Sequence, residues 1–334
     1  MRKILLLYVL LSVLPSMCAQ ECMTVMFYNT ENLFDTDDDP EKDDDDYTPE
    51  GDFHWTRKRY FNKLDAVSKV IVAADEDNAP GLVGLCEVEN ETVMTDLTSR
   101  SALRAAGYRY VMTDSPDLRG IDVALLYRRT CFQYISHESL GVSLVPLKNT
   151  PTRDVLHVMG RIASGDTLDI YVCHWPSRIG GVEQTEPLRM RAASMVRRSV
   201  DDVFAERRKP YVIIMGDLND GPGAQALTDG LGTKPYREAV SLDDRNLVSV
   251  MDGLTDGSYR YEGYWDQYDQ FVVSASLLNG LGCTEIKSAR VFDFDFLLED
   301  DNDYGGQKPM RTFHGRKYQN GYSDHLPIGL VLSY

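Results

Sequence analysis

Short apolar runs recur from one end of the chain to the other, and they restrict the fold more than any other feature. Each run is of strand length and is bounded by residues that favour turns. The predicted strands cover residues 24–28, 81–86, 122–127, 155–162, 168–173, 211–215, 270–273 and 328–332. The turn at residues 164–166 (Ser-Gly-Asp) predicts that the fourth and fifth strands form a hairpin.

Helical periodicity lies between these strands. Apolar residues recur at helical spacing over residues 60–71 and 193–204, with polar residues between them. A third helix is expected over residues 91–106, where Gly107 would end it. Because no linker-like segment divides the chain, one domain is expected over residues 20–334. Helices interleaved with strands predict a layered α/β domain whose sheets are covered by helices.

Residues 1–19 have the pattern of an export signal. Arg2 and Lys3 precede an apolar stretch, and small residues lead to a cleavage site after Ala19. The stretch is shorter than the ~18–20 residues that a membrane helix needs. We therefore expect an exported protein, periplasmic or extracellular, without stable membrane insertion. Acylation of Cys18, as in a lipoprotein, is the less favoured alternative.

The chain is strongly acidic, with a formal charge of −17 that would become −19 once Arg2 and Lys3 are removed. Such a chain repels polyanions, so a nucleic-acid substrate would require a local basic patch or metal ions. Five of the six cysteines follow the leader, and this odd, widely spaced set does not indicate a disulfide framework. Cys86 and Cys173 are interpreted as buried packing residues.

Two acidic stretches fit neither a strand nor a helix. Residues 35–46 hold eight aspartates and one glutamate. A calcium-binding loop needs Gly at its sixth position and Glu at its twelfth, where this stretch has Pro40 and Asp46. We interpret residues 35–46 as a solvated, mobile loop, and residues 299–306 as a second loop of the same kind.

Two polar strings lie directly beside predicted strands. Residues 216–220 (Gly-Asp-Leu-Asn-Asp) follow one strand, and residues 323–327 (Ser-Asp-His-Leu-Pro) precede another. Strand ends hold catalytic groups rigidly. Hydrolysis of a phosphate ester needs a cation for the non-bridging oxygens, a group that positions water, and a donor for the departing alkoxide. The chain offers candidates for all three.

Asp217 and Asn219 are candidates for the water and the phosphate. Their side chains lie on the same side of an extended chain, so one would hold the attacking water while the other donates to a phosphate oxygen. Asp324 is assigned to the metal or the water. Its neighbour His325 would point the opposite way, so the carboxylate that orients His325 must lie elsewhere, and Asp269 is the best candidate.

Glu87 is the candidate metal ligand, because a carboxylate at the mouth of a buried strand suits Mg²⁺. Glu89 and Glu91 are near enough in sequence to compete for this role. Asn29 would orient the acid that binds the metal.

His174 and Arg178 follow another predicted strand. A histidine there is often structural, but a nearby guanidinium is well shaped to bind phosphate oxygens and favours a functional role. The other histidines, at positions 54, 137, 157 and 314, are interpreted as structural.

The order of these motifs resembles the endonuclease/exonuclease/phosphatase superfamily. The resemblance rests on residues 28–32 (Tyr-Asn-Thr-Glu-Asn), Glu87, residues 122–127, His174, residues 216–219, residues 268–269 and residues 323–325. It covers nearly the whole chain after the leader, and the ordered set is far more specific than any single motif.

The resemblance implies a four-layered α/β sandwich in which two mixed central sheets are flanked by helices. It also implies a Mg²⁺ or Mn²⁺ site between the sheets. Glu87 would be the principal metal ligand, with Asn29 and Asp324 close to it.

The resemblance also assigns the catalytic roles. Asp217 would position or deprotonate the water, Asn219 would brace the phosphate, and the pair of Asp269 and His325 would contact the scissile group. His174 matches the histidine of the deoxyribonuclease branch.

The substrate class follows from smaller details. Asp122 would orient His174, and residues 174–178 resemble a string of exported bacterial nucleases. The Cys-Asp-Arg triplet expected of inositol-polyphosphate phosphatases is absent after Asp269.

The expected function is an exported, Mg-dependent phosphodiester hydrolase, a nuclease acting on DNA or RNA, with the chain as a monomer. The alternative is an exported phosphatase or phospholipase-type enzyme acting on a small phosphorylated metabolite or lipid head group. A silent binding protein is disfavoured because every expected acid, amide and histidine is present.

Overall fold

The computed structural model describes residues 21–75, 79–280 and 284–334. The predicted leader at residues 1–19 lies outside the described residues. The helices are α1 (Arg57–Ala73), α2 (Glu91–Arg100) and α3 (Val182–Glu206), with short helical turns at Asp45–Tyr47, Ala102–Ala106, Ala226–Leu231, Tyr236–Ser241, Met251–Gly253, Ala275–Leu277 and Asp295–Leu297. None of the helices in these ranges is long and apolar enough to cross a membrane.

The strands alternate with these helices along the chain. They are β1 (Cys22–Leu33), β2 (Leu82–Val88), β3 (Tyr108–Met112), β4 (Asp122–Arg128), β5 (Phe132–Leu140), β6 (Val155–Ile162), β7 (Thr167–His174), β8 (Tyr211–Asp217), β9 (Thr233–Pro235), β10 (Leu247–Ser249), β11 (Tyr259–Tyr261), β12 (Tyr264–Asp266), β13 (Asp269–Ser274), β14 (Glu285–Val291), β15 (Leu298–Asp300), β16 (Gln307–Pro309), β17 (Phe313–His314), β18 (Lys317–Tyr318) and β19 (Ile328–Ser333).

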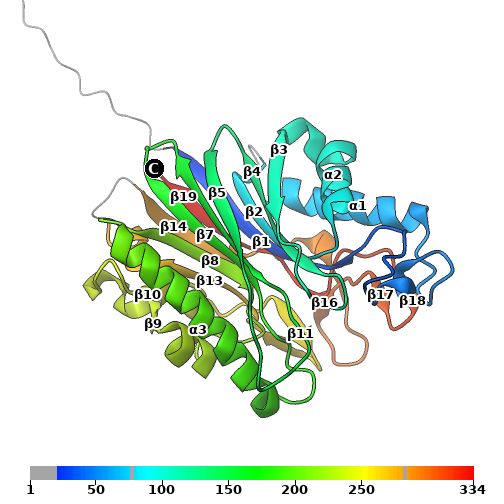
Figure 1. The fold of residues 1–334 in the computed structure, drawn as a ribbon. Coiled ribbons are helices and arrows are strands. Elements are labelled where there is room, and N and C mark those ends of the chain that lie inside the picture. Colours follow the sequence, from blue (N-terminus) through cyan, green and yellow to red (C-terminus); the bar gives the residue numbers. More distant parts are fainter. Residues whose placement is uncertain (1–20, 76–78, 281–283) are drawn as a thin grey trace, which may run out of the picture.

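Two large sheets form the centre of the molecule. The first has the order β14-β19-β1-β2-β4-β3 and the second β5-β6-β7-β8-β13-β10-β9. Both are mixed, because β1 runs parallel to β2 and β7 runs parallel to β8, while most other pairs are antiparallel. Helices α1 and α2 lie on the outside of the first sheet and α3 lies along the outside of the second (Figure 1). The predicted four-layered sandwich is therefore confirmed.

Strand β8 shows why the sequence builds this layering. Its residues Ile213 and Met215 join the core between the two sheets, whereas Val212 and Ile214 pack with the apolar face of α3. This alternation follows from the two-residue period of a strand that is covered on both faces. Burial of each such side chain contributes roughly 1.5–3 kcal/mol.

The predicted elements compare well with the observed ones. Each of the eight predicted strands overlaps an observed strand, and β6 and β7 form the predicted hairpin. The third helix is shorter than predicted. Helix α2 ends at Arg100 because Ser101 adopts an extended conformation and its hydroxyl accepts the N–H of Leu103, which begins a separate 3₁₀ turn. Gly107 ends that turn in the left-handed region, with φ of 68°.

The two acidic stretches are more structured than predicted. In residues 35–46, Asp44 is buried and accepts the N–H of Asp39, while Lys42 Nζ donates to the carbonyl of Ser115 at 2.9 Å. The first bond closes the segment on itself, and Lys42 ties it to the rest of the domain, since its Nζ also donates to the Asp117 carbonyl at 3.2 Å. Of residues 299–306, predicted as a loop, Glu299 and Asp300 belong to strand β15, and residues 301–306 form the loop of the β15–β16 hairpin as predicted. Cys86 and Cys173 are buried and free, as predicted.

Candidate functional site

Three predicted site residues form a row across the second sheet. His174 is in register with Asp217 on β8, and Asp217 is in register with Asp269 on β13. Each of the three continues the face of its strand that packs between the sheets, since the residues two positions away belong to that core. The strand period alone thus directs one imidazole and two carboxylates into the same space.

The first sheet supplies Asn29 and Glu87 from the facing side. The pairing of β1 with β2 shifts register after Asn29, and the pairing of β2 with β4 shifts register between Cys86 and Val88. Such bulges redirect side chains at strand ends. Glu87 lies at the second bulge with φ of 59°, and Asn219 on the other sheet has φ of 53°. A positive φ is uncommon outside glycine and is typical of functional positions.

Asp217 lies where the two sheets meet. Its Oδ2 accepts from Asn29 Nδ2 at 3.1 Å and lies 3.7 Å from His325 Nε2 and 3.8 Å from His174 Nε2. Its Oδ1 accepts the backbone N–H of Asn219 at 2.9 Å. Burial, together with the nearby Asp269 and Glu87, raises the pKa of Asp217 to about 7, against the lowering effect of His325. The amide of Asn29 thus binds Asp217 directly, and its place at the metal stays a prediction.

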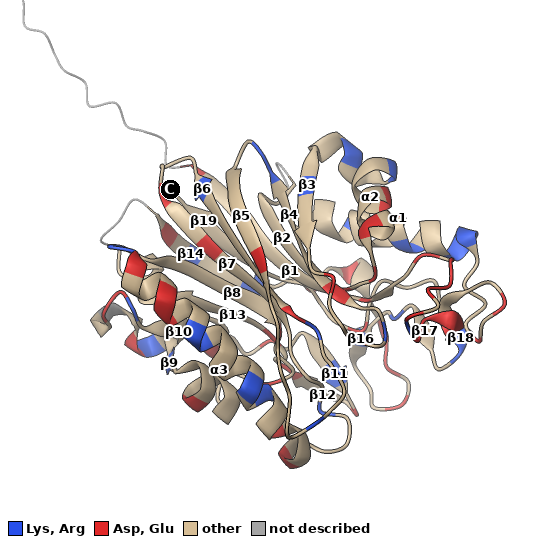
Figure 2. Ribbon diagram, in the orientation of Figure 1, with Lys and Arg blue, Asp and Glu red and all other residues tan. Residues whose placement is uncertain are grey.

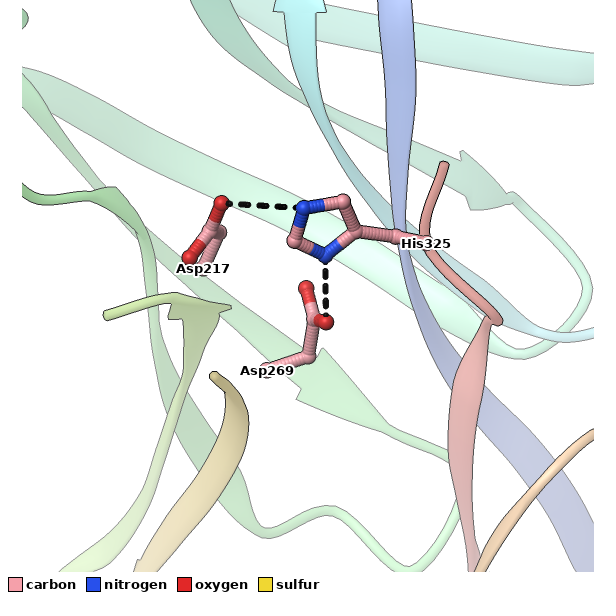
Figure 3. Close-up of side chains that lie close together, drawn as sticks. All are labelled: Asp217, Asp269 and His325. Atoms are coloured by element: carbon pink, nitrogen blue, oxygen red, sulfur yellow. Dashed lines mark hydrogen bonds and ion pairs between the residues drawn. The ribbon is translucent and has the colours of Figure 1, made fainter. Parts of the chain in front are cut away.

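The predicted pair of His325 and Asp269 is present. His325 Nδ1 and Asp269 Oδ2 are 2.7 Å apart (Figure 3). Ser258 Oγ donates to the same Asp269 oxygen. Burial lowers the pKa of His325, but Asp269 and Asp217 outweigh burial and hold that pKa well above its usual value. Both neighbouring carboxylates thus favour the protonated form of the buried His325 imidazole, whose Nε2 faces the space beside Asp217.

His174 has the opposite electrostatic character. Burial, with Arg153 and Arg119 nearby, lowers the pKa of His174 well below its usual value. Its Nε2 faces Glu87 Oε1 at 3.9 Å and Asp217 at 3.8 Å, while its Nδ1 has no hydrogen-bond partner among the described residues. The prediction that Asp122 orients His174 was wrong, since Asp122 instead accepts from Thr113 Oγ1 and the Ser115 N–H.

Glu87 presents a carboxylate oxygen suited to a hard cation. Its Oε2 accepts the Asn32 N–H at 2.9 Å, whereas Oε1 makes no hydrogen bond among the described residues and lies 4.0 Å from Arg119. Asp324 Oδ2 accepts from Arg311 at 2.9 Å, whereas its Oδ1 has no hydrogen bond to the residues that the structure describes. Oxygen donors of this kind fit Mg²⁺ or Mn²⁺, and the surrounding groups fit the predicted metal site. Glu89 turns away and accepts the Asp35 N–H instead.

Glu31 and Arg311 belong to the same region and were not predicted. Arg311 donates to Glu31 at 3.1 Å and to Asp324 at 2.9 Å, and the Thr312 N–H donates to Glu31 at 2.7 Å. Burial lowers the pKa of Lys63 to about 8, against the raising effect of Glu31, Asp324 and Glu87. Glu31 was within the motif at residues 28–32, but nothing in the sequence indicated the partner of Arg311.

Another group of ligand atoms belongs to Asp217, Asp269 and His325, which lie within 4.8 Å of one another. Here His325 Nδ1 is engaged in the short hydrogen bond with Asp269. A metal at this position would have to replace that bond, whereas the free oxygens of Glu87 and Asp324 require no such change. We therefore assign the imidazole and its two carboxylates to the substrate side of the site.

Arg178 and Asn219 lie at the site, but some of their polar groups already make hydrogen bonds within the protein. Arg178 donates to Asp220 at 2.7 Å and to the Asn219 carbonyl at 2.8 Å, and it stacks over the ring of Tyr268. Asn219 Nδ2 donates to the Trp175 carbonyl at 3.1 Å. Arg178 therefore holds the loop that follows β8, and its role as a phosphate ligand stays a prediction.

The chain matches the model of the Endonuclease/Exonuclease/phosphatase family over residues 24–333. It therefore belongs to this family, whose members are phosphoester hydrolases. No curated protein sequence matches the chain.

Several solved structures share the fold. An endonuclease/exonuclease/phosphatase family protein from Bacteroides thetaiotaomicron has a TM-score of 0.59 at 16% identity, over 94% of this chain and 98% of that one. TDP2 from D. rerio, complexed with a single-strand DNA product, has a TM-score of 0.56 at 13% identity, over 93% and 98%. A mannosyl-6-phosphatase from Bacteroides thetaiotaomicron has a TM-score of 0.56 at 15% identity, over 93% and 100%. At these identities the likeness establishes the fold alone.

Proposed function

We propose that the protein is an exported, Mg²⁺-dependent hydrolase of small phosphate esters. The observation that carries this proposal is the convergence of Glu87, Asp217 and His325, residues from three separate parts of the chain, around His174. His174 Nε2 lies 3.9 Å from Glu87 Oε1 and 3.8 Å from Asp217 Oδ2. His325 Nε2 lies 3.7 Å from the same Asp217 oxygen. Such a group supplies a cation ligand, a base and a cationic donor for one reaction.

The residues divide the reaction between them. Asp217 accepts a proton from the attacking water, and Asn29 and the Asn219 N–H hold its carboxylate in place. The water oxygen forms a bond to phosphorus as the bond from phosphorus to the alcohol oxygen breaks, and the departing alkoxide takes up the proton that Asp217 received, which returns Asp217 to its carboxylate form. His325, kept positively charged by Asp269, donates from Nε2 to a phosphoryl oxygen.

A divalent cation held by Glu87 and Asp324 would neutralise the non-bridging oxygens of the phosphate. Asn29 and Glu31 lie beside these ligands and stabilise the strand end that carries them. His174 is neutral and hydrogen-bonds the phosphate through Nε2, since a second imidazolium next to His325 would be repelled.

A small ester is favoured over a long nucleic acid because the arginines in and beside the site are already paired with acceptors of this protein. They are Arg119, Arg178, Arg260 and Arg311. In Figure 2 the Lys and Arg segments are interspersed with Asp and Glu segments rather than gathered in one track. A polynucleotide gains affinity from unpaired cations along its backbone, so the pairing of these four arginines within the protein favours the smaller substrate.

Nuclease action on DNA or RNA, which the sequence favoured, is the second candidate. Tyr259 stacks on Tyr268 at 5.1 Å and lies 4.8 Å from the ring of His325. Aromatic platforms of this kind bind nucleobases.

The test is hydrolysis of p-nitrophenyl phosphate, bis(p-nitrophenyl) phosphate and nicked plasmid, each with Mg²⁺ or Mn²⁺ and with chelator. We expect chelator-sensitive turnover that is fastest on the monoester, and Asp217→Asn should lower kcat by about 10² or more. Asp252→Asn, an exposed charge removal, is the matched control. Turnover that survives chelation, or failure to cleave any of the three substrates, would contradict the proposal. Efficient plasmid cleavage would favour the nuclease.

A further inference from the structure

A pocket of about 330 Å³ adjoins the candidate site and is not used by the reaction described above. It lies between the hairpin of β11 and β12 and the hairpin of β15 and β16, and Asp324 and Arg311 form its boundary with the site. The lower strands β11 and β16 mark its position in Figure 1. Its volume is at the lower end of the range for small-molecule sites, which suits a ligand of one ring rather than a polymer.

The pocket is attached firmly to the catalytic residues. Tyr259, the first residue of β11, forms a β-bridge with His325, and the Leu326 N–H donates to the Ser258 carbonyl at 2.7 Å. Arg260 then joins the two hairpins, because it donates to the carbonyls of Gln307 at 2.8 Å and Gly305 at 2.6 Å. The pocket wall and the catalytic histidine therefore hold a fixed relative position.

One glycine makes the close approach of the hairpins possible. Gly263, at the turn between β11 and β12, has φ of 85°, and a Cβ there would lie 2.9 Å from Cβ of Tyr304. Tyr304 is packed under this turn and is still 60% exposed, and Tyr261 is 58% exposed. Two tyrosine rings thus line the pocket and remain accessible to a ligand.

The charged groups of the lining have both signs. Asp301 already has partners within the protein, since Arg260 Nε lies 3.2 Å from its carboxylate and two backbone N–H groups donate to it. Glu299 and Asp303 have side chains without a hydrogen bond to any described residue, and Lys308 lies close to Asp301 at 3.9 Å. The lining therefore offers acceptors and donors next to each other, beside two aromatic rings.

This combination selects one kind of ligand. A second phosphate would be repelled by the free carboxylates, and an ammonium group would be opposed by Arg260, Lys308 and Arg311. A neutral hydroxyl donates and accepts at once, so a polyhydroxylated ring satisfies both kinds of group. Its apolar face can cover an amphipathic tyrosine ring.

We propose that this pocket binds the alcohol part of the substrate, a neutral glycosyl ring, while its phosphate lies between Asp217 and His325. This inference rests on the proposed function and names its substrate class as sugar phosphates. Glu299 and Asp303 accept hydrogen bonds from ring hydroxyls, and Tyr304 packs against the ring. These residues set substrate binding and take no part in bond breaking.

The experiment compares kcat/KM for hexose 6-phosphates with that for p-nitrophenyl phosphate, using wild type, Glu299→Gln and Tyr304→Ala. Tyr264→Ala is the matched control, because Tyr264 is 77% exposed on the same hairpin but does not line the pocket. Each pocket variant should lose about tenfold or more in kcat/KM on the sugar phosphate, mainly through KM. Turnover of p-nitrophenyl phosphate should remain within about twofold of wild type.

A binding measurement separates this inference from the proposed function. Calorimetric titration of the free hexose should show binding to wild type and to Tyr264→Ala that is weakened in both pocket variants. If p-nitrophenyl phosphate is cleaved but the pocket variants change kcat/KM for the sugar phosphate and for p-nitrophenyl phosphate by the same factor, the glycosyl inference fails and the hydrolase proposal stands. A preference for choline phosphate or a nucleotide over every hexose phosphate would also overturn it, and absence of all cleavage would overturn the hydrolase proposal itself.

Discussion

Replacement of Asp269 by Asn tests the electrostatic core of the site. Asp269 is almost fully buried, and its Oδ2 lies 2.7 Å from His325 Nδ1. The substitution keeps the size of the side chain but removes the charge that holds His325 protonated. An amide that donates to Nδ1 favours the neutral imidazole protonated at Nε2, which can still donate to the phosphate but carries no positive charge.

The magnitude follows from that distance. Two unit charges 2.7 Å apart attract by about 6 kcal/mol at an effective dielectric constant of about 20. Part of this attraction is offset by the desolvation of both groups, and loss of one partner from a buried pair costs about 3–5 kcal/mol in total. If the same free energy is lost from the transition state, kcat should fall by a factor of about 10² to 10⁴.

The assay measures kcat on p-nitrophenyl phosphate at saturating Mg²⁺, together with an NMR titration of the His325 imidazole. We expect kcat to fall and the pKa of His325 to move down toward its ordinary value. Asp252→Asn removes an exposed charge and should change neither measurement. A variant at position 269 with kcat within about twofold of wild type and an unmoved His325 titration would refute the assigned role of the pair.

Three further predictions follow from the contacts described above. Glu87→Gln should raise the Mg²⁺ concentration for half-maximal activity by about tenfold or more, and an unchanged titration would remove Glu87 as a ligand. Arg178→Ala should lower the melting temperature and kcat together rather than raise KM alone, because Arg178 holds Asp220 at 2.7 Å; a change in KM alone would restore it as a phosphate ligand. Burial lowers the pKa of His157, but Asp169 and Glu138, at 3.1 and 2.9 Å, raise it overall. The stability that His157 adds is therefore complete below its unfolded-state pKa of about 6.5 and is lost as the pH rises through the higher folded-state value. Wild type should then exceed His157→Gln in free energy of unfolding by more at about pH 5.5 than at about pH 9, and equal or reversed differences would contradict this.

Much of the candidate site could be predicted from sequence because it depends on the strand period. His174, Asp217 and Asp269 each continue the inner face of an apolar run, so their common direction was fixed by alternation along each strand. The polar strings beside β8 and β19 lay at strand ends for the same local reason. The pairing of His325 with Asp269 followed from excluding its neighbour Asp324.

Roles that depend on distant partners were not predictable. The amide of Asn29 binds Asp217, 188 positions away, and Arg311 binds Glu31, 280 positions away. The prediction for Arg178 considered the shape of its guanidinium but not the acceptors that the folded loop supplies. A single sequence states which groups are available, whereas contacts across such separations depend on the packing of whole sheets.

The sequence by itself determined a layered α/β domain and the faces on which the polar residues emerge, because alternation and helical spacing are local properties of the chain; the arrangement in two central sheets was implied by the family resemblance. Only the tertiary structure decided how the charges are paired. It placed Arg311 between Glu31 and Asp324, left one oxygen each of Glu87 and Asp324 without a hydrogen bond in the described part of the chain, and brought two short hairpins together beside His325. The physical reason is that a buried charge is stabilised by whichever group reaches it in space, and that group is set by long-range packing.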